Sequence, residues 1–512
     1  MSALELIIAL FVAAVLLAAA ARRVGAPYPV FLALGGVAIA LLPGTPALTV
    51  PPDLALALFV APVLLDAAYD ASTRDLKDNW IPVTGLVVFA VGFTTAAVAV
   101  ITRVLIPEVP WPVAIALGAV VAPPDAVAAT AVLRQVRPPH RILTILEGES
   151  LFNDATALLI YRLAVGAAVA GTFSLTSVAP AFLLAIAGSL LVGPGLGWLT
   201  VRLMERVEHI PSAIILQFAS AFTVWIVAEH TGLSAVLTTV CFAITAARTP
   251  ERVSTRIRIP TYAVWETVVF ALNILAFIFI GMQIQPIVAN LDSGERGRYL
   301  VVAGAVLLTV MIVRVAWHMP FNLIVRWRHR QFGFNPPRPM LRPSPGSGMV
   351  ISWAGMRGIV TLAAAMALPP GFPYRDLIVL TAFFVVLGTL VIQGLTLKPL
   401  LRWLDLRDDD PVGRETRGAQ ERALSAALET IAGDQSPTAH AVSHQLEAVL
   451  APEGNLRATQ FAEQTADVHG RVVSAARQAV LDMRARDEIG DDAFHAVEEQ
   501  LDRFEASLQS KE

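Results

Sequence analysis

One stretch of the chain places acidic side chains inside an apolar run: ILEGESLFNDATALLI, residues 145–160. Its acidic and polar oxygen-bearing side chains in the middle of the run are Glu147, Glu149, Ser150, Asn153 and Asp154. On a helix with about 3.6 residues per turn they form two adjacent stripes, and therefore one polar wedge. A carboxylate in hydrocarbon costs several kcal/mol, so in a bilayer this wedge must face a protein interior or a water-filled cavity. The alternative is a structural polar patch that joins helices.

Composition places the chain among membrane proteins. Its 512 residues are 55% hydrophobic and only 15% charged, with a mean hydropathy of +0.63. Soluble domains contain about 25% charged residues. A single cysteine, Cys241, excludes an intrachain disulfide framework. We therefore expect an all-α polytopic membrane protein.

Thirteen apolar runs have roughly the length of a membrane span. They cover residues 3–21, 27–43, 52–70, 81–104, 111–133, 142–169, 177–203, 211–229, 233–247, 262–285, 299–325, 347–369 and 375–400. The connections and run ends on one side of the membrane carry 21 Lys and Arg residues, whereas those on the other side carry four. The positive-inside rule then predicts an N-terminus outside and a C-terminus in the cytoplasm.

Two of these runs are interrupted. The fifth contains Ala-Pro-Pro-Asp at residues 122–125, and the twelfth contains Gly-Met-Arg-Gly at residues 355–358. Tandem prolines break a helix, and the freed carbonyl groups are tolerated at membrane depth only where they line a cavity. Runs seven spans apart cross the membrane in opposite directions, as in inverted repeats whose broken helices meet at a ligand site. Two unrelated kinks are the alternative.

The membrane part of the chain offers a set of oxygen ligands and one compensating cation. These are the acids Asp66, Asp125, Glu147, Glu149 and Asp154, the neutral Ser150 and Asn153, and the cation Arg357. Hard cations such as Na⁺ prefer oxygen ligands. A carboxylate in a partly dry cavity holds either a proton or a metal cation, and alternating access to such a site exchanges one for the other. If one carboxylate exchanges one proton for one monovalent cation, no net charge moves.

Four runs resemble the sodium/proton antiporters of the NhaP/NHE type, within the cation:proton antiporter superfamily. They are LEGESLFNDATALLIYR (146–162), GAVVAPPDAVAATAVL (118–133), WETVVFALNILAFIFIGMQI (265–284) and SWAGMRGIVTLAAAMALP (352–369). The resemblance covers residues 1–403, and its most specific part is the Asn-Asp pair after Gly-Glu-Ser-Leu. It implies about 13 helices with inverted repeats and two crossed discontinuous helices.

The resemblance also implies roles for individual residues. Asp154 is similar to the family's ion-binding and proton-carrying aspartate, and Asn153 to the asparagine of the electroneutral branch. Ser150 and Asp125 are similar to further cation ligands or their support, and Asp66 to an acid of the third span. These four oxygen-bearing side chains, Asp154, Asp125, Ser150 and Asp66, are thus the expected cation ligands.

Charge compensation is expected from a second group of residues. Arg357 resembles the arginine that steadies the crossing of the broken helices, and Glu149 resembles a glutamate paired with an arginine. We expect Arg357 to be the partner of Glu149, with Glu147 beside them. The family commonly has Ser/Thr-Pro-Thr-Asp where this chain has Pro124 before the aspartate. At that position only the carbonyl oxygen is available as a ligand, so the preference among Na⁺, Li⁺ and K⁺ stays open.

The C-terminal part of the chain is acidic. Residues 405–512 contain 11 basic and 22 acidic residues. We expect residues 1–403 to form the exchanger domain, 404–417 a linker, and 418–512 a helical cytoplasmic regulatory domain. The spacing of Phe494, Val497, Leu501, Phe504 and Leu508 predicts a seam in a helix that starts near Gly490-Asp491-Asp492, either inside a small bundle or at a docking or dimer contact. Among His440, His444, His469 and His495, solvated surface positions are expected rather than pH sensing.

Other classes of function fit less well. An intramembrane aspartyl protease lacks its Gly-x-Gly-Asp motif, and neither His-Glu-x-x-His nor Gly-x-Ser-x-Gly occurs. A channel is open as an alternative, and so is a K⁺/H⁺ antiporter of the same fold. We expect no enzymatic activity, no cofactor and no nucleic-acid partner. The expected protein is a homodimeric sodium/proton antiporter of a bacterial inner membrane, acting in pH homeostasis.

Overall fold

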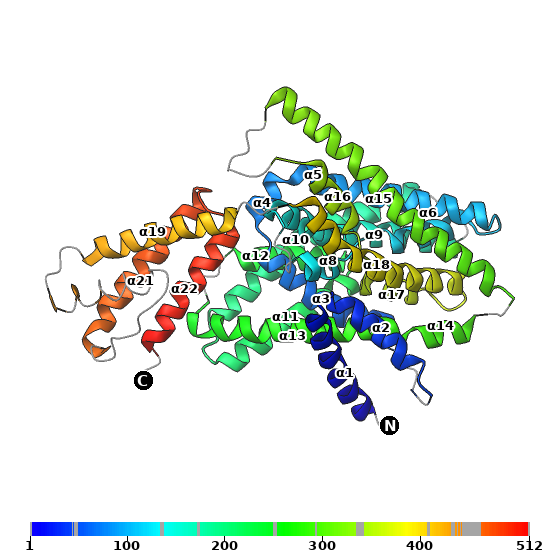
Figure 1. The fold of residues 1–512 in the computed structure, drawn as a ribbon. Helices are drawn as coiled ribbons and strands as arrows, with labels where there is room; N and C mark the ends of the chain where they lie inside the picture. The colour runs from blue at the N-terminus through cyan, green and yellow to red at the C-terminus, as the bar shows by residue number, and fades with distance from the viewer. Residues whose placement is uncertain are drawn as a thin grey trace.

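The structure is a computed structural model of the 512-residue chain. It describes residues 3–43, 45, 50–133, 138–170, 175–248, 253–291, 294–333, 342–406, 410–431, 436–437, 439–440, 442 and 462–509. Within these ranges all regular structure is helical, as expected (Figure 1).

The helices of the first half of the chain include both halves of the broken fifth run. They are α1 (Ala3–Val24), α2 (Tyr28–Ala40), α3 (Pro52–Asp70), α4 (Thr73–Asp78), α5 (Trp80–Thr84), the π-helical segment η1 (Gly85–Ala90), α6 (Val91–Leu105), α7 (Trp111–Val121), α8 (Ala126–Leu133), α9 (His140–Ala170), α10 (Leu175–Met204), α11 (Ile210–His230) and α12 (Ala235–Ala247). Proline lies in the first turn of α2, α3, α7 and α11. In that turn its missing N–H removes no intrahelical bond.

The second half of the chain is also helical and includes both halves of the broken twelfth run. It contains α13 (Thr255–Met282), α14 (Ile284–Asn290), α15 (Arg296–Phe332), α16 (Pro345–Trp353), α17 (Ile359–Met366), α18 (Arg375–Leu404), α19 (Pro411–Ile431), α21 (Ala462–Ala485) and α22 (Asp491–Gln509). Each of the thirteen apolar runs therefore coincides with one helix, a continuous helical stretch or a broken pair.

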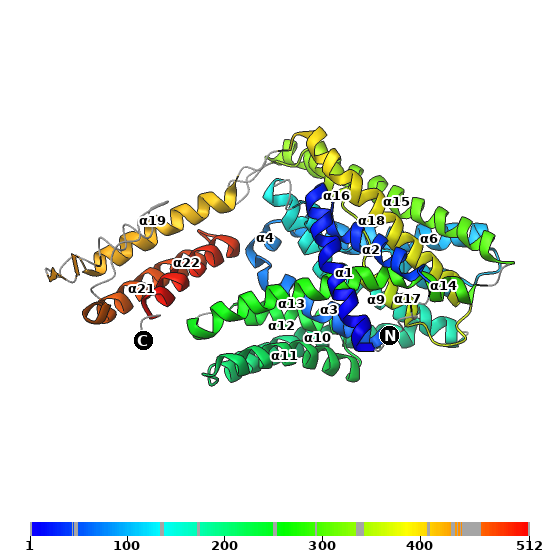
Figure 2. The same cartoon turned by 60° about the horizontal axis from the view of Figure 1, so that its bottom comes forward.

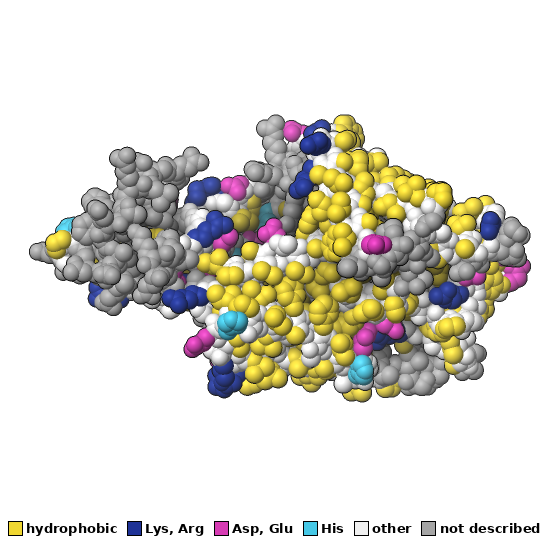
Figure 3. Space-filling model, turned by 90° about the horizontal axis from the view of Figure 1, so that it is seen from below, with side chains coloured by type: hydrophobic (Ala, Val, Ile, Leu, Met, Phe, Trp, Pro, Cys, Tyr) yellow, Lys and Arg dark blue, Asp and Glu magenta, His cyan; other side chains and the backbone are white. Residues whose placement is uncertain are grey.

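Eight helical stretches of the described chain are long and apolar enough to cross a membrane, and α2, α7 and α12 are shorter apolar helices. Figure 3 shows a broad hydrophobic expanse on one face of these helices, with few charged side chains. Exposed side chains such as Leu184, Leu191 and Trp198 of α10 belong to the apolar surface of the molecule. Such a surface suits lipid contact. That all thirteen runs cross the bilayer stays a prediction.

Small residues let some of these helices approach closely. A Cβ atom added to Gly36 of α2 would collide with the carbonyl oxygen of Ile278, and one added to Gly281 of α13 would collide with that of Ala33. Lipid tails are as apolar as the helix surfaces, so the hydrophobic effect does not drive helices together inside a bilayer. Close backbone packing of this kind is therefore a main source of helix association. The contact fixes α2 against the C-terminal end of α13.

Helices α19, α21 and α22 pack together as a separate bundle beside the N-terminal end of α13 (Figures 1 and 2). The bundle core contains Ala423, Ala427 and Val480 together with Phe494, Val497 and Leu501 of the predicted seam. Phe504 packs at its edge, and the side chain of Leu508 lies outside the described part. The seam thus belongs to the core of a small bundle, and the predicted start of α22 is confirmed.

Two expectations for this region are corrected. α19 begins at Pro411, so the second half of the predicted linker 404–417 is helical. Asp410 precedes this proline and accepts a hydrogen bond from the Gly413 amide at 3.1 Å, which makes Asp-Pro a helix start rather than a break. His495 is not at a solvated surface, because its ring stacks on Tyr69 of α3 with centroids 6.4 Å apart. His440 is exposed, whereas His444 and the side chain of His469 lie outside the described residues.

Candidate cation site at the crossing of two broken helices

The two interrupted runs meet, as the sequence predicts. The α7–α8 pair is broken at residues 122–125, and the α16–α17 pair at residues 354–358. The backbone amide of Asp125 in the first break donates a hydrogen bond to the carbonyl of Met356 in the second, at 2.6 Å. A Cβ atom on Gly358 would collide with the carboxylate of Asp125, so glycine is required for this approach. The crossing is therefore a direct backbone contact between the two breaks.

Arg357 satisfies carbonyl groups that the end of α7 leaves free. Its Nε donates to the carbonyl of Val121 and its Nη2 to that of Ala122, both at 3.0 Å. Nη1 donates to the Gly355 carbonyl, and the backbone amide donates to Oγ1 of Thr389 at 3.0 Å. The side chain is 1% exposed. A guanidinium at the C-terminal end of α7 supplies the donors and the positive charge that this helix end lacks.

Helix α9 presents the polar wedge to this crossing. Nδ2 of Asn153 donates to the carbonyl of Pro124 at 3.0 Å, while Oδ1 is buried and has no hydrogen-bond partner among the described residues. The next residue, Asp154, is 6% exposed and makes no hydrogen bond or ion pair with any residue that the structure describes. Ser150 lies half-buried one turn earlier on α9. Unpartnered oxygen atoms are thus concentrated at Asn153 and Asp154.

Asp125 supplies the second carboxylate of the site. Its Oδ1 accepts a hydrogen bond from the amide of Val127 at 2.9 Å, at the start of α8. The carboxyl groups of Asp125 and Asp154 interact electrostatically, and two negative charges there repel each other. A proton on one carboxyl group or a monovalent cation between the two relieves this repulsion. The same group of oxygen atoms can therefore hold either species, and each excludes the other.

Comparisons with known proteins identify the family of this chain. The sequence model of the transmembrane sodium/hydrogen exchanger family matches residues 7–403. This chain belongs to the sodium/hydrogen exchanger family. The match covers all but the first six residues of the predicted membrane domain and ends near the end of α18.

Relatives of this exchanger carry names of the same kind. A protein of Bacillus subtilis, named a sodium, potassium, lithium and rubidium/H⁺ antiporter, is 28% identical over 94% of this chain and 74% of its own length. An uncharacterized Na⁺/H⁺ exchanger of Mycobacterium tuberculosis is 29% identical over 99% of this chain and 96% of its own length. The solved sodium proton antiporter MjNhaP1 from Methanocaldococcus jannaschii matches with a TM-score of 0.61 at 18% identity, covering 79% of this chain and 98% of that one. This last likeness establishes the fold.

The expected partner of Glu149 was wrong. Glu149 of the exchanger pairs with Arg314 of α15, whose Nη1 and Nη2 donate to the two carboxylate oxygens at 2.5 and 2.6 Å. Arg314 also donates to the carbonyls of Ile351 and Ser352 at the end of α16. Arg357 is instead occupied by backbone carbonyls, which explains why it needs no acid. The sequence does contain a feature that points to this pairing. Arg314 is a lone arginine inside the apolar run 299–325, and an arginine within a membrane span is usually paired with a buried acid.

Two further predicted site residues, Asp66 and Glu147, are described through other neighbours. Asp66 is half-buried on α3 and lines a cavity of about 290 Å³ with Tyr69, Arg258 and Tyr262. None of Ser150, Asp125 and Asp154 is among the described residues that line this cavity. Glu147 acts electrostatically on His140, two turns earlier on the same face of α9. The contacts described at the crossing are those of Asn153, Asp154, Asp125, Pro124 and Arg357, and the part of Ser150 and Asp66 in the site stays a prediction.

Proposed function

We propose that this exchanger carries one monovalent cation against one proton, with Asp154 as the group that binds both in turn. Na⁺ is the expected cation, and Li⁺ and K⁺ are the alternatives. The observation that supports the assignment is a buried Asp154 without a described partner, next to the unpartnered Oδ1 of Asn153 and across from Asp125. Oxygen ligands of this kind suit hard cations.

Competition at one site couples the two fluxes. When Asp154 is ionised, its carboxylate, the amide oxygen of Asn153 and the Asp125 carboxylate attract a cation. When Asp154 is protonated, the charge that held the cation is gone, and the cation leaves. Alternating exposure of the crossing to the two sides of the membrane then exchanges the cation for a proton. The roles of Ser150, the Pro124 carbonyl and Asp66 are to complete the oxygen shell or to line the path to it.

Fixed charges near the site do not take part in proton transfer in this mechanism. Arg357 caps the carbonyl groups of α7, and Arg314 neutralises Glu149. Arginine keeps its charge at all physiological pH values. Both cations therefore hold the crossing together, and the proton is carried by an aspartate.

The orientation of the protein in the membrane is inferred from the distribution of basic residues. Arginines and lysines concentrate in the connections on the side of the C-terminal domain. We place that domain in the cytoplasm, the N-terminus outside, and the protein as a homodimer in a bacterial inner membrane. Regulation of exchange is the role we assign to the bundle of α19, α21 and α22.

Exchange in proteoliposomes tests the central assignment. A pH gradient should drive Na⁺ uptake by the wild-type protein, and Asp154→Asn should abolish it because an amide neither releases a proton nor balances the cation's charge. Glu108→Gln is the matched control, since Glu108 pairs with Arg298 in an exposed connection. Near-normal exchange by a folded Asp154→Asn protein would refute the assignment. A flux that dissipates an ion gradient without coupled proton movement would identify a channel instead.

A further inference from the structure

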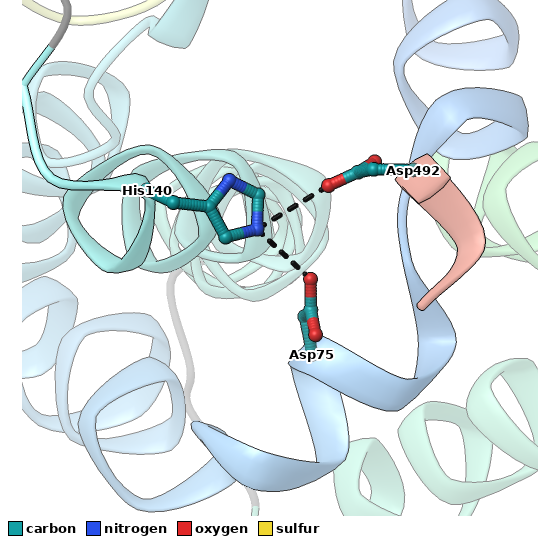
Figure 4. Close-up of side chains that lie close together, drawn as sticks. All are labelled: Asp75, His140 and Asp492. Atoms are coloured by element: carbon teal, nitrogen blue, oxygen red, sulfur yellow. Dashed lines mark hydrogen bonds and ion pairs between the residues drawn. The ribbon is translucent and has the colours of Figure 1, made fainter. Parts of the chain in front are cut away.

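A second cluster of charged side chains joins the exchanger domain to the C-terminal domain. His140 is the first residue of α9, Asp75 lies on α4, and Asp492 lies in the first turn of α22. Nε2 of His140 is 3.0 Å from Oδ2 of Asp75 and 3.3 Å from Oδ2 of Asp492. Figure 4 shows the imidazole directing this one nitrogen between the two carboxylates. The three residues thus converge from three separate helices.

Nε2 of His140 has more oxygen neighbours than a single N–H group can bond. Oγ1 of Thr144 also lies 3.3 Å from Nε2. An imidazole nitrogen carries at most one hydrogen, so it donates well to only one of these three acceptors. A metal ion bound to the nitrogen has no such limit. The arrangement therefore fits a cation that several ligands share.

The separations also match a metal site. The ligand atoms of Asp75, His140 and Asp492 all lie within 4.8 Å of one another. Zn²⁺ binds imidazole nitrogen and carboxylate oxygen at about 2.0–2.2 Å in tetrahedral geometry, which places neighbouring ligand atoms about 3.3 Å apart. The two distances from Nε2 are close to this value. Only small side-chain movements would be needed to admit an ion.

The electrostatic surroundings favour a cation. Glu147 adds its negative charge to those of Asp75 and Asp492 at His140, and Asp70 and Asp491 add theirs at Asp492. Two neighbouring arginines are engaged with other acids, and Arg141 donates to Oδ1 of Asn79 at 2.9 Å. Arg74, whose Nε is 3.9 Å from Asp75 Oδ1, directs Nη2 to Glu415 at 2.5 Å, and Arg484 binds Asp491 at 2.9 Å. Among the residues that the structure describes around the cluster, acidic side chains thus outnumber arginines.

The ligands are held in place by the docking of the two domains. Asp75 is 6% exposed, and its amide donates to the N-capping hydroxyl of Ser72 at 3.1 Å. The carboxylate of Asp491 accepts a hydrogen bond from the Thr73 amide at 2.8 Å. This bond fixes the start of α22 against the start of α4, and so brings Asp492 to His140. The site exists only when the C-terminal domain is docked.

We propose that Asp75, His140 and Asp492 bind a divalent transition-metal ion of the Zn²⁺ type, with Thr144 or a water molecule as the fourth ligand. The bound ion fastens the C-terminal domain to the start of α9. Asp154 lies fourteen residues further along this helix, about 21 Å at the usual rise per residue. Cytoplasmic metal would therefore act on the helix that carries the transport site.

Zn²⁺ binding to the full-length protein tests the site directly. The purified protein, stripped of metal with EDTA, is titrated with ZnCl₂ against a chromophoric chelator, with Mg²⁺ and Ca²⁺ for comparison. We expect Zn²⁺ to bind at about micromolar or tighter Kd, and the oxygen-preferring Mg²⁺ and Ca²⁺ to bind more weakly. Each of His140→Gln and Asp492→Asn should weaken Zn²⁺ binding by about 100-fold. His209→Gln, which changes an exposed histidine bonded to Ser212, should leave binding unchanged.

Hydrogen exchange supplies a second readout that does not depend on transport. Zn²⁺ should slow amide exchange in both α4 and α22 of the wild-type protein, and in neither helix of His140→Gln. Glutamine keeps an N–H donor for the carboxylates, so thermal melts in EDTA should show that this variant is folded. Equal Zn²⁺ affinity of wild type and His140→Gln would overturn the site. Binding that survives Asp492→Asn, or a Zn²⁺ effect confined to α4, would overturn the link between the domains.

Discussion

The side-chain amide of Asn153 donates a hydrogen bond to the carbonyl of Pro124, so the residue before Asp154 holds the break between α7 and α8. The same side chain leaves its oxygen buried and unpartnered in the described structure. Asn153 therefore has two separate tasks. Its nitrogen stabilises the broken helix, and its oxygen faces the site where we place the cation.

Replacing Asn153 by aspartate should make protein stability depend on pH. A carboxylic acid can donate to the Pro124 carbonyl only while it is protonated, and an ionised carboxylate there would repel both the carbonyl and Asp154. We expect Asn153→Asp to melt near the wild-type temperature in acid and below it in alkaline buffer, with a loss of about 1–3 kcal/mol. Melting curves of both proteins across this pH range measure the effect. Identical curves would show that the Asn153–Pro124 bond contributes nothing.

The buried Glu149–Arg314 pair should be a strong determinant of stability. Removing one member of such a pair leaves an uncompensated buried charge and costs about 3–5 kcal/mol. We expect Arg314→Gln and Glu149→Gln each to lower stability by this amount, and the double variant to recover part of the loss. A double-mutant cycle in detergent measures the coupling. The exposed Arg298–Glu108 pair is the control, and its cycle should give less than about 1 kcal/mol.

Substitution of Arg357 should separate its charge from its geometry. Arg357→Ala leaves the carbonyls of Val121 and Ala122 without donors, and each buried unpaired group costs about 1–3 kcal/mol. Arg357→Lys keeps a positive charge but loses the planar fork that reaches both carbonyls. We expect lysine to restore part of the stability and little of the exchange activity. Wild-type melting of Arg357→Ala would contradict the role we assign to this guanidinium.

The crossing could be predicted because its signals are local. Tandem prolines at 123–124 and glycines on both sides of Arg357 interrupt otherwise regular apolar runs. Chain polarity then determines that the two breaks face each other. The polar wedge of α9 follows in the same way from helical spacing.

Pairing between distant segments could not be predicted by such rules. Glu149 and Arg314 are 165 residues apart, and no local spacing links an acid on one helix with an arginine on another. His495 illustrates the same limit, because its burial arises from the docking of α22 on Tyr69. From the sequence, each of these side chains has several acceptable partners, and only the packing of the helices selects one.

Acid should loosen the C-terminal domain through His495. Burial lowers the pKa of His495 to about 4, Arg484 and Arg258 contribute in the same direction, and Asp491 opposes them. In the unfolded chain the pKa is about 6.5. The unfolded state therefore binds more protons between these values, and stability present above about pH 6.5 is lost as the pH falls toward 4.

The expected loss from about pH 7 to about pH 5 is up to about 2 kcal/mol. Burial raises the pKa of Glu498 despite Arg258, which gives an opposite slope, so the contribution of His495 must be isolated. The difference between wild type and His495→Gln, followed by thermal melting in EDTA, isolates it. Parallel stability profiles of the two proteins would mean that His495 is protonated equally in the folded and unfolded states.

Exchange should be electroneutral. Asn153 supplies an amide where a second carboxylate would add a titrating charge, and Arg314 and Arg357 keep their protons. Of the three lysines, Lys77 and Lys511 lie outside the apolar spans, and Lys398 of α18 donates to the carbonyl of Gly25 at 2.8 Å. The cycle therefore has one titrating carrier, Asp154, unless Asp125 or Asp66 releases a proton in the same step.

Voltage distinguishes these two cases. The membrane potential does about 2.3 kcal/mol of work per net charge per 100 mV, so even one net charge per cycle shifts the equilibrium measurably. Proteoliposomes clamped with valinomycin and K⁺ at 0 and about −100 mV should reach the same Na⁺/H⁺ equilibrium. If K⁺ is itself a substrate, a lipophilic cation sets the voltage in its place. A shift of the equilibrium with voltage would show that two protons move per cation, and Asp125→Asn and Asp66→Asn would then identify the second carrier by abolishing that shift.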